Sequence, residues 1–306
     1  MLKEYLGLPD QRLGVVLQRF ATALNSGRFS IKRDLSFIFL CGANRPELIP
    51  SERRQYLKKT IEAALPHARI VYAERVMDEL VKHGKTKNLL DIEYQISRIA
   101  DWILIVLESY SSFCELGAFA TDNLRSKLIV INDSNFRSHQ SFINLGPLQA
   151  IVEDVAEDRV IWYPMQSSGI TIRDAIGMTL PTVLKHLRNK HTRTSLNSAS
   201  CFPNIESQAS LFFLHDIIYL CGPITHSETI EIYRKIYGNQ SFNEIKALRA
   251  ILHAAELITT VIIDNEPAYL TVTPDTFINI DTAGKDLLSA FRRFHLKHNS
   301  ARLIHA

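Results

Sequence analysis

The chain has 306 residues, of which 46% are hydrophobic and 22% are charged, so it can bury a sizeable core and is not disordered as a whole. Its formal net charge of +3 does not by itself indicate a nucleic-acid partner, and its N-terminus lacks the apolar stretch of a signal peptide. The longest apolar strand, Trp102–Leu107, is too short to span a bilayer, and the four cysteines form no CxxC pair. We therefore expect a soluble cytoplasmic protein with two domains, reduced cysteines and no metal site.

The first half of the chain alternates continuous apolar stretches with helical patterns. After an amphipathic N-terminal segment, the helices are predicted from Pro50-Ser51 to Leu65, from Asn88 to Ala100 and from Ser112 onward. The strands are predicted at Ser36–Cys41, Arg69–Ala73, Trp102–Leu107, Lys127–Asn132 and Arg159–Tyr163. Continuous apolar strands between helices predict an α/β fold, with a parallel sheet covered by helices on both faces.

The second half has a different period. Ile170–Asn189 predicts a long connecting helix, and the Ser- and Asn-rich stretch Thr194–Ser200 predicts a linker. Three helical segments at about 206–222, 226–238 and 241–256 precede a β-hairpin, which is the layout of a winged helix. Thr225-x-x-Glu228 and Ser241-x-x-Glu244 fit capping boxes at two of the helix starts.

These patterns predict four parts. They are an N-terminal helical segment (1–35), a catalytic α/β domain (36–165), a connecting helix and linker (166–200), and a smaller winged-helix-like α+β domain (201–306).

One stretch, ESYSSFCELGAFA at Glu108–Ala120, places the carboxylate of Glu115 at the start of an otherwise apolar helix. The motif alone favours a capping box in which Glu115 bonds back to the backbone N–H of Ser112. The location favours a ligand site, because open α/β sheets bind ligands outside the carboxyl ends of their strands. There, Ser109 and Ser112 permit close approach, and the helix start supplies free N–H groups.

This stretch resembles the catalytic segment of nucleoside 2′-deoxyribosyltransferases, in which a Ser-rich loop leads to a Glu followed by Leu-Gly. The chain is more closely similar to the deoxyribosyltransferase-like effector proteins of type II retrons, which also have a C-terminal winged-helix-like domain. That similarity is carried, in order, by IFLCG (38–42), SFCELGAF (112–119), NLRSKLIVIND (123–133) and SFINLGP (141–147).

The resemblance implies roles for individual residues. Glu115 falls on the nucleophile that attacks the sugar C1′ carbon, and Glu93 falls where the family often has an acidic residue. Cys41, Gly42 and Asn44 fall on the first loop of the substrate pocket, and Asn144 on a segment that completes it, although Asn-Leu-Gly-Pro is also an ordinary turn.

Two further residues are open to two interpretations. Arg45 is a candidate for binding a substrate phosphate, or a surface residue. Asp91, like Glu93, either hydrogen-bonds sugar hydroxyls and helps to protonate the departing base, or lies on a solvated helix face.

The resemblance also implies a biological role: the toxic effector of an antiphage toxin–antitoxin system, restrained by a reverse transcriptase and its branched RNA–DNA product (msDNA). Such an effector, a possible homo-oligomer, would cleave the N-glycosidic bond of NAD or another nucleotide through an ionised Glu115, without a cofactor. Arg292, Arg293 and Lys297 could contact phosphates of that nucleic acid, or form a solvated helix face. The alternatives are a non-enzymatic nucleotide sensor and a transcriptional regulator.

Overall fold

The computed structural model describes residues 2–7, 12–32, 36–82, 88–188, 195–272 and 275–304. The chain divides into two compact units: one comprises residues 34–191, and the other comprises residues 1–33 together with 192–306. The N-terminal helices therefore group with the C-terminal half of the chain. Residues 189–194, which include the end of the expected connecting helix and the start of the expected linker, lie outside the described residues.

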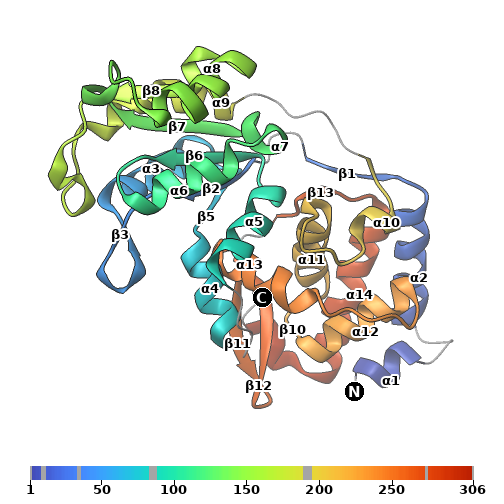
Figure 1. Cartoon of the computed structure of the whole chain (residues 1–306). Coiled ribbons are helices and arrows are strands. Elements are labelled where there is room, and N and C mark those ends of the chain that lie inside the picture. Colours follow the sequence, from blue (N-terminus) through green and yellow to red (C-terminus); the bar gives the residue numbers. More distant parts are fainter. Residues whose placement is uncertain are drawn as a thin grey trace. The chain divides into compact units, whose positions relative to one another are not determined.

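The unit of residues 34–191 is built on a five-stranded, wholly parallel sheet, as predicted (Figure 1). Its strands in spatial order are β5 (Ala68–Val71), β2 (Ser36–Cys41), β6 (Trp102–Val106), β7 (Leu128–Asp133) and β8 (Val160–Tyr163). A separate two-stranded hairpin, β3 (Asn44–Arg45) and β4 (Ile49–Pro50), follows β2.

Helices cover both faces of this sheet because alternate strand residues point to opposite sides. Every residue of β2 and β6 is buried, which explains why these strands read as continuous apolar runs. On one face, Ile38 and Leu104 join a cluster with Leu57 of α3 and Val183 of α9. On the other face, Phe39 packs edge-on against Phe119 of α6, with 5.8 Å between the ring centroids.

The helices of this unit have the following bounds: α3 (Glu52–Ala64), α4 (Ala73–Lys82), α5 (Leu89–Ile99), α6 (Tyr110–Phe119), α7 (Asp122–Arg125), α8 (Gln149–Asp154) and α9 (Leu180–Leu187). The helices predicted from Pro50-Ser51 to Leu65 and from Asn88 to Ala100 are confirmed, with Ser51 and Asn88 as their N-caps. Helix α4 was not predicted.

The prediction of one long helix over Ile170–Asn189 is wrong. One 3₁₀ turn, Ser167–Ile170, ends where the predicted helix should begin, and a second, Ala175–Thr179, precedes α9. The side chain of Asp174 accepts a hydrogen bond from the backbone N–H of Ile176 (3.0 Å), which starts a new turn at this position.

The strand order places a topological switch point between β2 and β6. After β2 the chain crosses to β5 on one side, and it then returns past β2 to add β6, β7 and β8 on the other side. In open α/β sheets, the crevice that binds ligands lies at such a point, outside the carboxyl ends of the strands. The loops that follow β2 and β6 begin at Gly42 and Leu107, so the loop leading to Glu115 starts at this point of the sheet.

The other unit contains mainly helices and two small antiparallel sheets. Its helices are α1 (Leu2–Gly7), α2 (Arg12–Asn25), α10 (Ser198–Cys201), α11 (Gln208–Cys221), α12 (His226–Tyr237), α13 (Ile245–Ala254) and α14 (Thr282–His298). One sheet has the order β13 (Ile278–Asn279), β1 (Phe29–Ile31) and β9 (Ser195–Leu196). The other has the order β10 (Ile224–Thr225), β12 (Glu266–Thr271) and β11 (Ile258–Ile263).

From α11 to β12, the order of elements is helix, short strand, two helices and a β-hairpin, so the predicted order of three helices followed by a hairpin is confirmed. The capping box of Thr225 with Glu228 is confirmed at the start of α12. The one proposed for Ser241 and Glu244 is wrong, because α13 begins at Ile245 with no side-chain cap.

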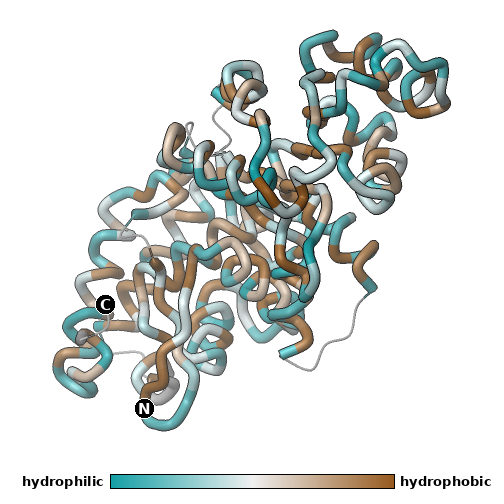
Figure 2. Tube along the Cα trace, turned by 90° about the vertical axis from the view of Figure 1, so that its left-hand side faces the viewer, coloured by the Kyte–Doolittle hydropathy of each residue, from teal (hydrophilic) through white to brown (hydrophobic). Residues whose placement is uncertain are grey.

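Hydrophobic and hydrophilic residues alternate along the helices of both units (Figure 2), as expected for helices with one face toward a core. Among the described helices, none combines the length and apolarity that a membrane span would require.

Candidate active site

Helix α6 begins earlier than the sequence pattern suggested. Its N-cap is Ser109, whose side chain accepts a hydrogen bond from the backbone N–H of Ser112 (3.3 Å). In return, the hydroxyl of Ser112 accepts a hydrogen bond from the backbone N–H of Ser109 (3.1 Å). The capping box therefore joins Ser109 to Ser112, and the predicted bond from Glu115 back to Ser112 is not formed.

Glu115 takes no part in the cap. It lies in the second turn of α6 and is half-buried. Its Oε2 atom is buried and accepts no hydrogen bond from any described residue. A buried polar atom without a partner is costly and uncommon in folded proteins, and it often marks a functional position. Glu115 thus has a carboxylate oxygen whose hydrogen-bonding capacity is not used by the described residues.

Burial and the neighbouring carboxylate of Glu93 raise the pKa of Glu115 to about 8, although Arg54 opposes this rise. Burial and Glu74 raise the pKa of Glu93, in α5, to about 7. The fold therefore brings Glu93 and Glu115 into one electrostatic environment. Two carboxyl groups that titrate near neutral pH can divide the roles of base and acid.

Arg54 supplies the positive charge of this group. Its guanidinium donates to Glu74 (2.7 Å to Oε1), to the side chain of Asn44 (2.7 Å) and to the backbone carbonyl of Leu40 (2.8 Å). It also lies over the Tyr72 ring, 4.7 Å from the centroid. Because Arg54 is paired with Glu74, the cluster of Glu74, Glu93 and Glu115 keeps an excess of carboxylate groups.

A second carboxylate after β6, that of Glu108, has hydrogen-bond donors at both of its oxygens. The side chain of Glu108 is completely buried. Its Oε1 accepts hydrogen bonds from the backbone N–H of Ala43 (3.0 Å) and the hydroxyl of Ser51 (2.6 Å), and its Oε2 accepts one from Arg53 (2.8 Å). Glu108 thereby ties the loop after β6 to the loop after β2 and to the start of α3.

Arg53 extends this tie to the segment after β8. Its guanidinium donates to Oδ2 of Asp174 from both Nε (3.0 Å) and Nη2 (2.8 Å), and also to the backbone carbonyl of Gln166. Burial opposes ionisation of Asp174, but the hydrogen bonds from Arg53 and from backbone N–H groups keep its pKa below the usual value. A side chain on Gly169 would collide with the Arg53 guanidinium, so this position requires glycine.

Gly42 is required by both conformation and space. Its φ of +153° is one that residues with side chains rarely adopt. A Cβ atom there would lie 2.9 Å from Arg54 Cδ and 2.9 Å from Glu108 Oε1. Gly42 therefore allows the loop after β2 to close over these two buried side chains.

Of the remaining predicted pocket residues, Cys41 lies beside the carboxylates. Burial, followed by Glu115 and Glu93, raises the pKa of its thiol well above the usual value, so it remains a neutral thiol. Asn44 accepts a hydrogen bond from Arg54, which gives it a positioning role in this structure. Arg45 is paired with Glu52 (2.6 Å).

Two predicted site residues, Asp91 and Asn144, form hydrogen bonds that do not involve Glu115. Asp91 is exposed, and its carboxylate accepts a hydrogen bond from the side-chain amide of its N-cap, Asn88 (2.9 Å). Asn144 lies in a π-helical turn, Asn144–Leu148, and its amide donates to the carbonyls of Phe136 and His139. In the other unit, Arg292, Arg293 and Lys297 are exposed on α14.

Sequence reasoning missed Arg53, Arg54, Glu74, Glu108 and Asp174. The available signal was the charge-rich helix start SERRQ directly after the strand and its Gly-containing loop, which places two arginines beside the carboxyl ends of the strands. No group of three His, Cys, Asp or Glu side chains among the described residues has an arrangement that could hold a metal ion. The pocket of about 640 Å³ along the outer side of α3 does not include Glu115.

Comparison with known proteins agrees with the predicted resemblance. Residues 50–260 match the family model of the STM3845 retron effector protein. The chain is 36% identical over 278 residues to the "Retron Ec73 putative ribosyltransferase/DNA-binding protein" of Escherichia coli, covering 87% of each chain. It is also 36% identical over 115 residues to the "Retron Ec86 putative ribosyltransferase/DNA-binding protein" of Escherichia coli, covering 37% of this chain and 36% of that relative.

Replacing Glu108 by Gln should destabilise the protein strongly, by about 3–5 kcal/mol, because the substitution leaves the buried guanidinium of Arg53 with one fewer negative partner. Urea unfolding, followed by circular dichroism, measures this loss. Glu52→Gln is the matched control, since it removes the same charge from the partly exposed pair with Arg45 and should cost less than about 1 kcal/mol. Equal stability of the two variants would contradict the role assigned to Glu108.

Proposed function

The chain belongs to the STM3845 retron effector protein family, and we propose that its α/β unit cleaves an N-glycosidic bond with Glu115 as the nucleophile. The observation that carries the proposal is the buried Oε2 atom of Glu115, which no described residue satisfies. Its position at the switch point of the sheet supports the same conclusion, because that crevice is where such folds bind ligands. The relatives' names, which include ribosyltransferase, agree with chemistry at a sugar carbon.

In the proposed reaction, the bond between C1′ and the base nitrogen breaks, and its electron pair leaves with the base. The resulting oxocarbenium-like C1′ carbon is captured by Oε2 of Glu115, which forms an ester. Water then attacks C1′, the ester bond breaks, and Glu115 is released as a carboxylate. Glu93, whose pKa of about 7 suits both roles, would accept the proton of the attacking water or protonate a neutral departing base.

The charge of the site favours a substrate with a cationic base. Glu74, Glu93 and Glu115 outnumber Arg54, which is already paired with Glu74. In NAD, the nicotinamide carries a positive charge next to the bond that would break, and it leaves as a neutral molecule without needing a proton. A positive charge beside Glu115 would also lower the pKa of its carboxyl and promote the ionised form that attacks. NAD is therefore the first substrate of the proposal.

The biological proposal follows from the family. The effector would be the toxic component of an antiphage system, held inactive by a retron reverse transcriptase and its branched RNA–DNA until infection. The exposed cations Arg292, Arg293 and Lys297 on α14 are the proposed contacts to the phosphates of this nucleic acid. The relatives' names, which include DNA-binding, support that assignment.

Glu115→Gln should abolish release of nicotinamide from NAD, or of the base from another nucleotide, because an amide cannot form the ester. Purified protein without its partners would be incubated with NAD and with a set of nucleosides and nucleotides, and base release measured by chromatography. Asp91→Asn is the control, since it removes an exposed carboxylate from α5 and should keep the wild-type rate. A Glu115→Gln protein that binds and cleaves normally would refute the nucleophile, and one that keeps its toxicity without cleavage would favour a sensor.

The pH dependence of the reaction should differ between two kinds of substrate. For NAD the rate requires only ionised Glu115, so kcat/KM should rise about tenfold per pH unit toward the pKa of about 8 and then level off. For a nucleoside with a neutral base, a proton from Glu93 is also needed, and the profile should be bell-shaped. Steady-state rates between about pH 5.5 and 9.5 provide the comparison. A profile for NAD that stays flat across neutral pH would exclude control by Glu115.

The triple variant Arg292→Ala/Arg293→Ala/Lys297→Ala should bind single-stranded DNA more weakly than the wild type. If all three cations contact phosphates, the slope of log affinity against log salt should fall by about 2. Fluorescence anisotropy with a labelled oligonucleotide at several salt concentrations measures both quantities. The control Arg12→Ala/Arg19→Ala/Lys235→Ala removes the same charge from exposed positions of α2 and α12. Equal losses in the two variants would mean that only net charge matters.

A further inference from the structure

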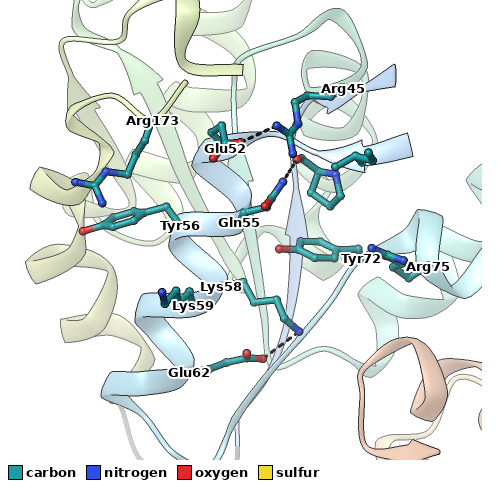
Figure 3. A pocket seen from close by; sticks show the side chains of 12 residues that line it. Arg45, Glu52, Gln55, Tyr56, Lys58, Lys59, Glu62, Tyr72, Arg75 and Arg173 are labelled. Atoms are coloured by element: carbon teal, nitrogen blue, oxygen red, sulfur yellow. Dashed lines mark hydrogen bonds and ion pairs between the residues drawn. The ribbon is translucent and has the colours of Figure 1, made fainter. Parts of the chain in front are cut away.

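A pocket of about 640 Å³ lies along the outer side of α3, away from the carboxylate cluster. Its lining comes from the β3–β4 hairpin, α3, the β5–α4 junction and the segment that contains Arg173 (Figure 3). The size is within the range of pockets that bind small molecules. The inner side of α3 carries Arg53 and Arg54 toward the buried carboxylates, so the two sites use opposite faces of the same helix.

The lining is strongly cationic. Five of its side chains are cations and two are anions, and both anions are already paired within the pocket: Arg45 with Glu52 (2.6 Å) and Lys58 with Glu62 (3.5 Å). Lys59, Arg75 and Arg173 are exposed and have no anionic partner among the described residues. The positive charge of these three residues is therefore not neutralised by the protein.

Aromatic rings lie against two of the pocket's cations. The guanidinium of Arg173 lies over the Tyr56 ring, 4.7 Å from the centroid, and Lys58 lies 5.8 Å from the centroid of Tyr72. Arg173 is also fixed through the chain, because the next residue, Asp174, is bonded to Arg53. In the view of Figure 3, Arg173 and Arg75 lie at opposite ends of the labelled set, with the two tyrosines between them.

We propose that this pocket binds a small polyphosphate anion, of the class carried in cells by free nucleoside triphosphates, through Lys59, Arg75 and Arg173. Three cations from three separate segments can contact successive phosphate groups, and a guanidinium can bind a phosphate through two parallel hydrogen bonds. Arg45 has a further donor, since its Nε is buried and no described residue accepts from it. A pocket of about 640 Å³ fits a compact ligand better than a duplex, which would need a longer basic surface.

This site is distinct from the proposed site of glycosidic cleavage. None of the carboxylates Glu74, Glu93 and Glu115 lines the pocket along α3. A nucleotide bound here does not contact Glu115, and its binding should not depend on Glu115.

The test measures binding by isothermal titration calorimetry in the Glu115→Gln background, which prevents turnover. The probes are inorganic tripolyphosphate, ATP, adenosine and a thymidine oligonucleotide of about 20 nucleotides. Tripolyphosphate and ATP should bind and adenosine should not. Lys59→Ala/Arg75→Ala should weaken both by about tenfold or more, and added salt should weaken them further. Since both residues are exposed, this variant should keep the fold, which its thermal unfolding checks.

The matched control is Arg137→Ala/Arg188→Ala, which removes the same charge from exposed positions outside the pocket and should change the affinity less than about twofold. Repeating the titration with Glu115 intact should give the same affinity for tripolyphosphate. The proposal is overturned if tripolyphosphate and ATP fail to bind, or if they bind equally to the Lys59→Ala/Arg75→Ala protein. The proposal is also overturned if only the oligonucleotide binds and the Lys59→Ala/Arg75→Ala protein loses this binding. The ligand of the pocket would then be a nucleic-acid strand and not a free nucleotide.

Discussion

The guanidinium of Arg53 joins three segments that meet at the carboxyl edge of the parallel sheet. It bonds Glu108 after β6 and Asp174 after β8, and it reaches both from the first turn of α3. A buried charge is tolerated only when its partners satisfy it, and here two carboxylates and a backbone carbonyl do so. The partners of Glu108, Ala43 and Ser51, extend this bonding to the loop after β2, so that both loops of the switch point are fixed.

Around this fixed frame, the carboxylates divide into two groups. Glu108 and Asp174 have their hydrogen-bonding capacity met and act as structural anions. Glu115 has a buried oxygen with no partner, and it has a raised pKa because burial and Glu93 oppose its ionisation. Such a group lowers the stability of the fold and is kept where chemistry requires it. Through Glu108, Arg53 fixes the loop that leads into α6, the helix that carries Glu115.

The strands were predictable because a sheet buried on both faces leaves continuous apolar runs, and each predicted strand of the α/β unit was found. The structural role of Arg53 could not be predicted from the sequence. Its partner Asp174 is 121 residues away, and two adjacent arginines on α3 are typical of a solvated helix face. The start of α6 was ambiguous because Ser109 and Ser112 can each cap a helix, and only the actual bonds separate them. Likewise, the helix predicted over Ile170–Asn189 is interrupted at Asp174. This carboxylate accepts hydrogen bonds from Arg53 and also caps the 3₁₀ turn that follows it.

The central claim is that Oε2 of Glu115 forms a bond to the sugar carbon, and covalent trapping tests it most directly. A substrate analogue with fluorine at the 2′ carbon slows both steps through its oxocarbenium-like transition states, so the ester should accumulate. Mass spectrometry of the digested protein should then find the added sugar on the peptide that contains Glu115, and none in the Glu115→Gln protein. Base release from the analogue with no adduct on any peptide, or an adduct on another residue, would contradict the assignment of Glu115 as the nucleophile.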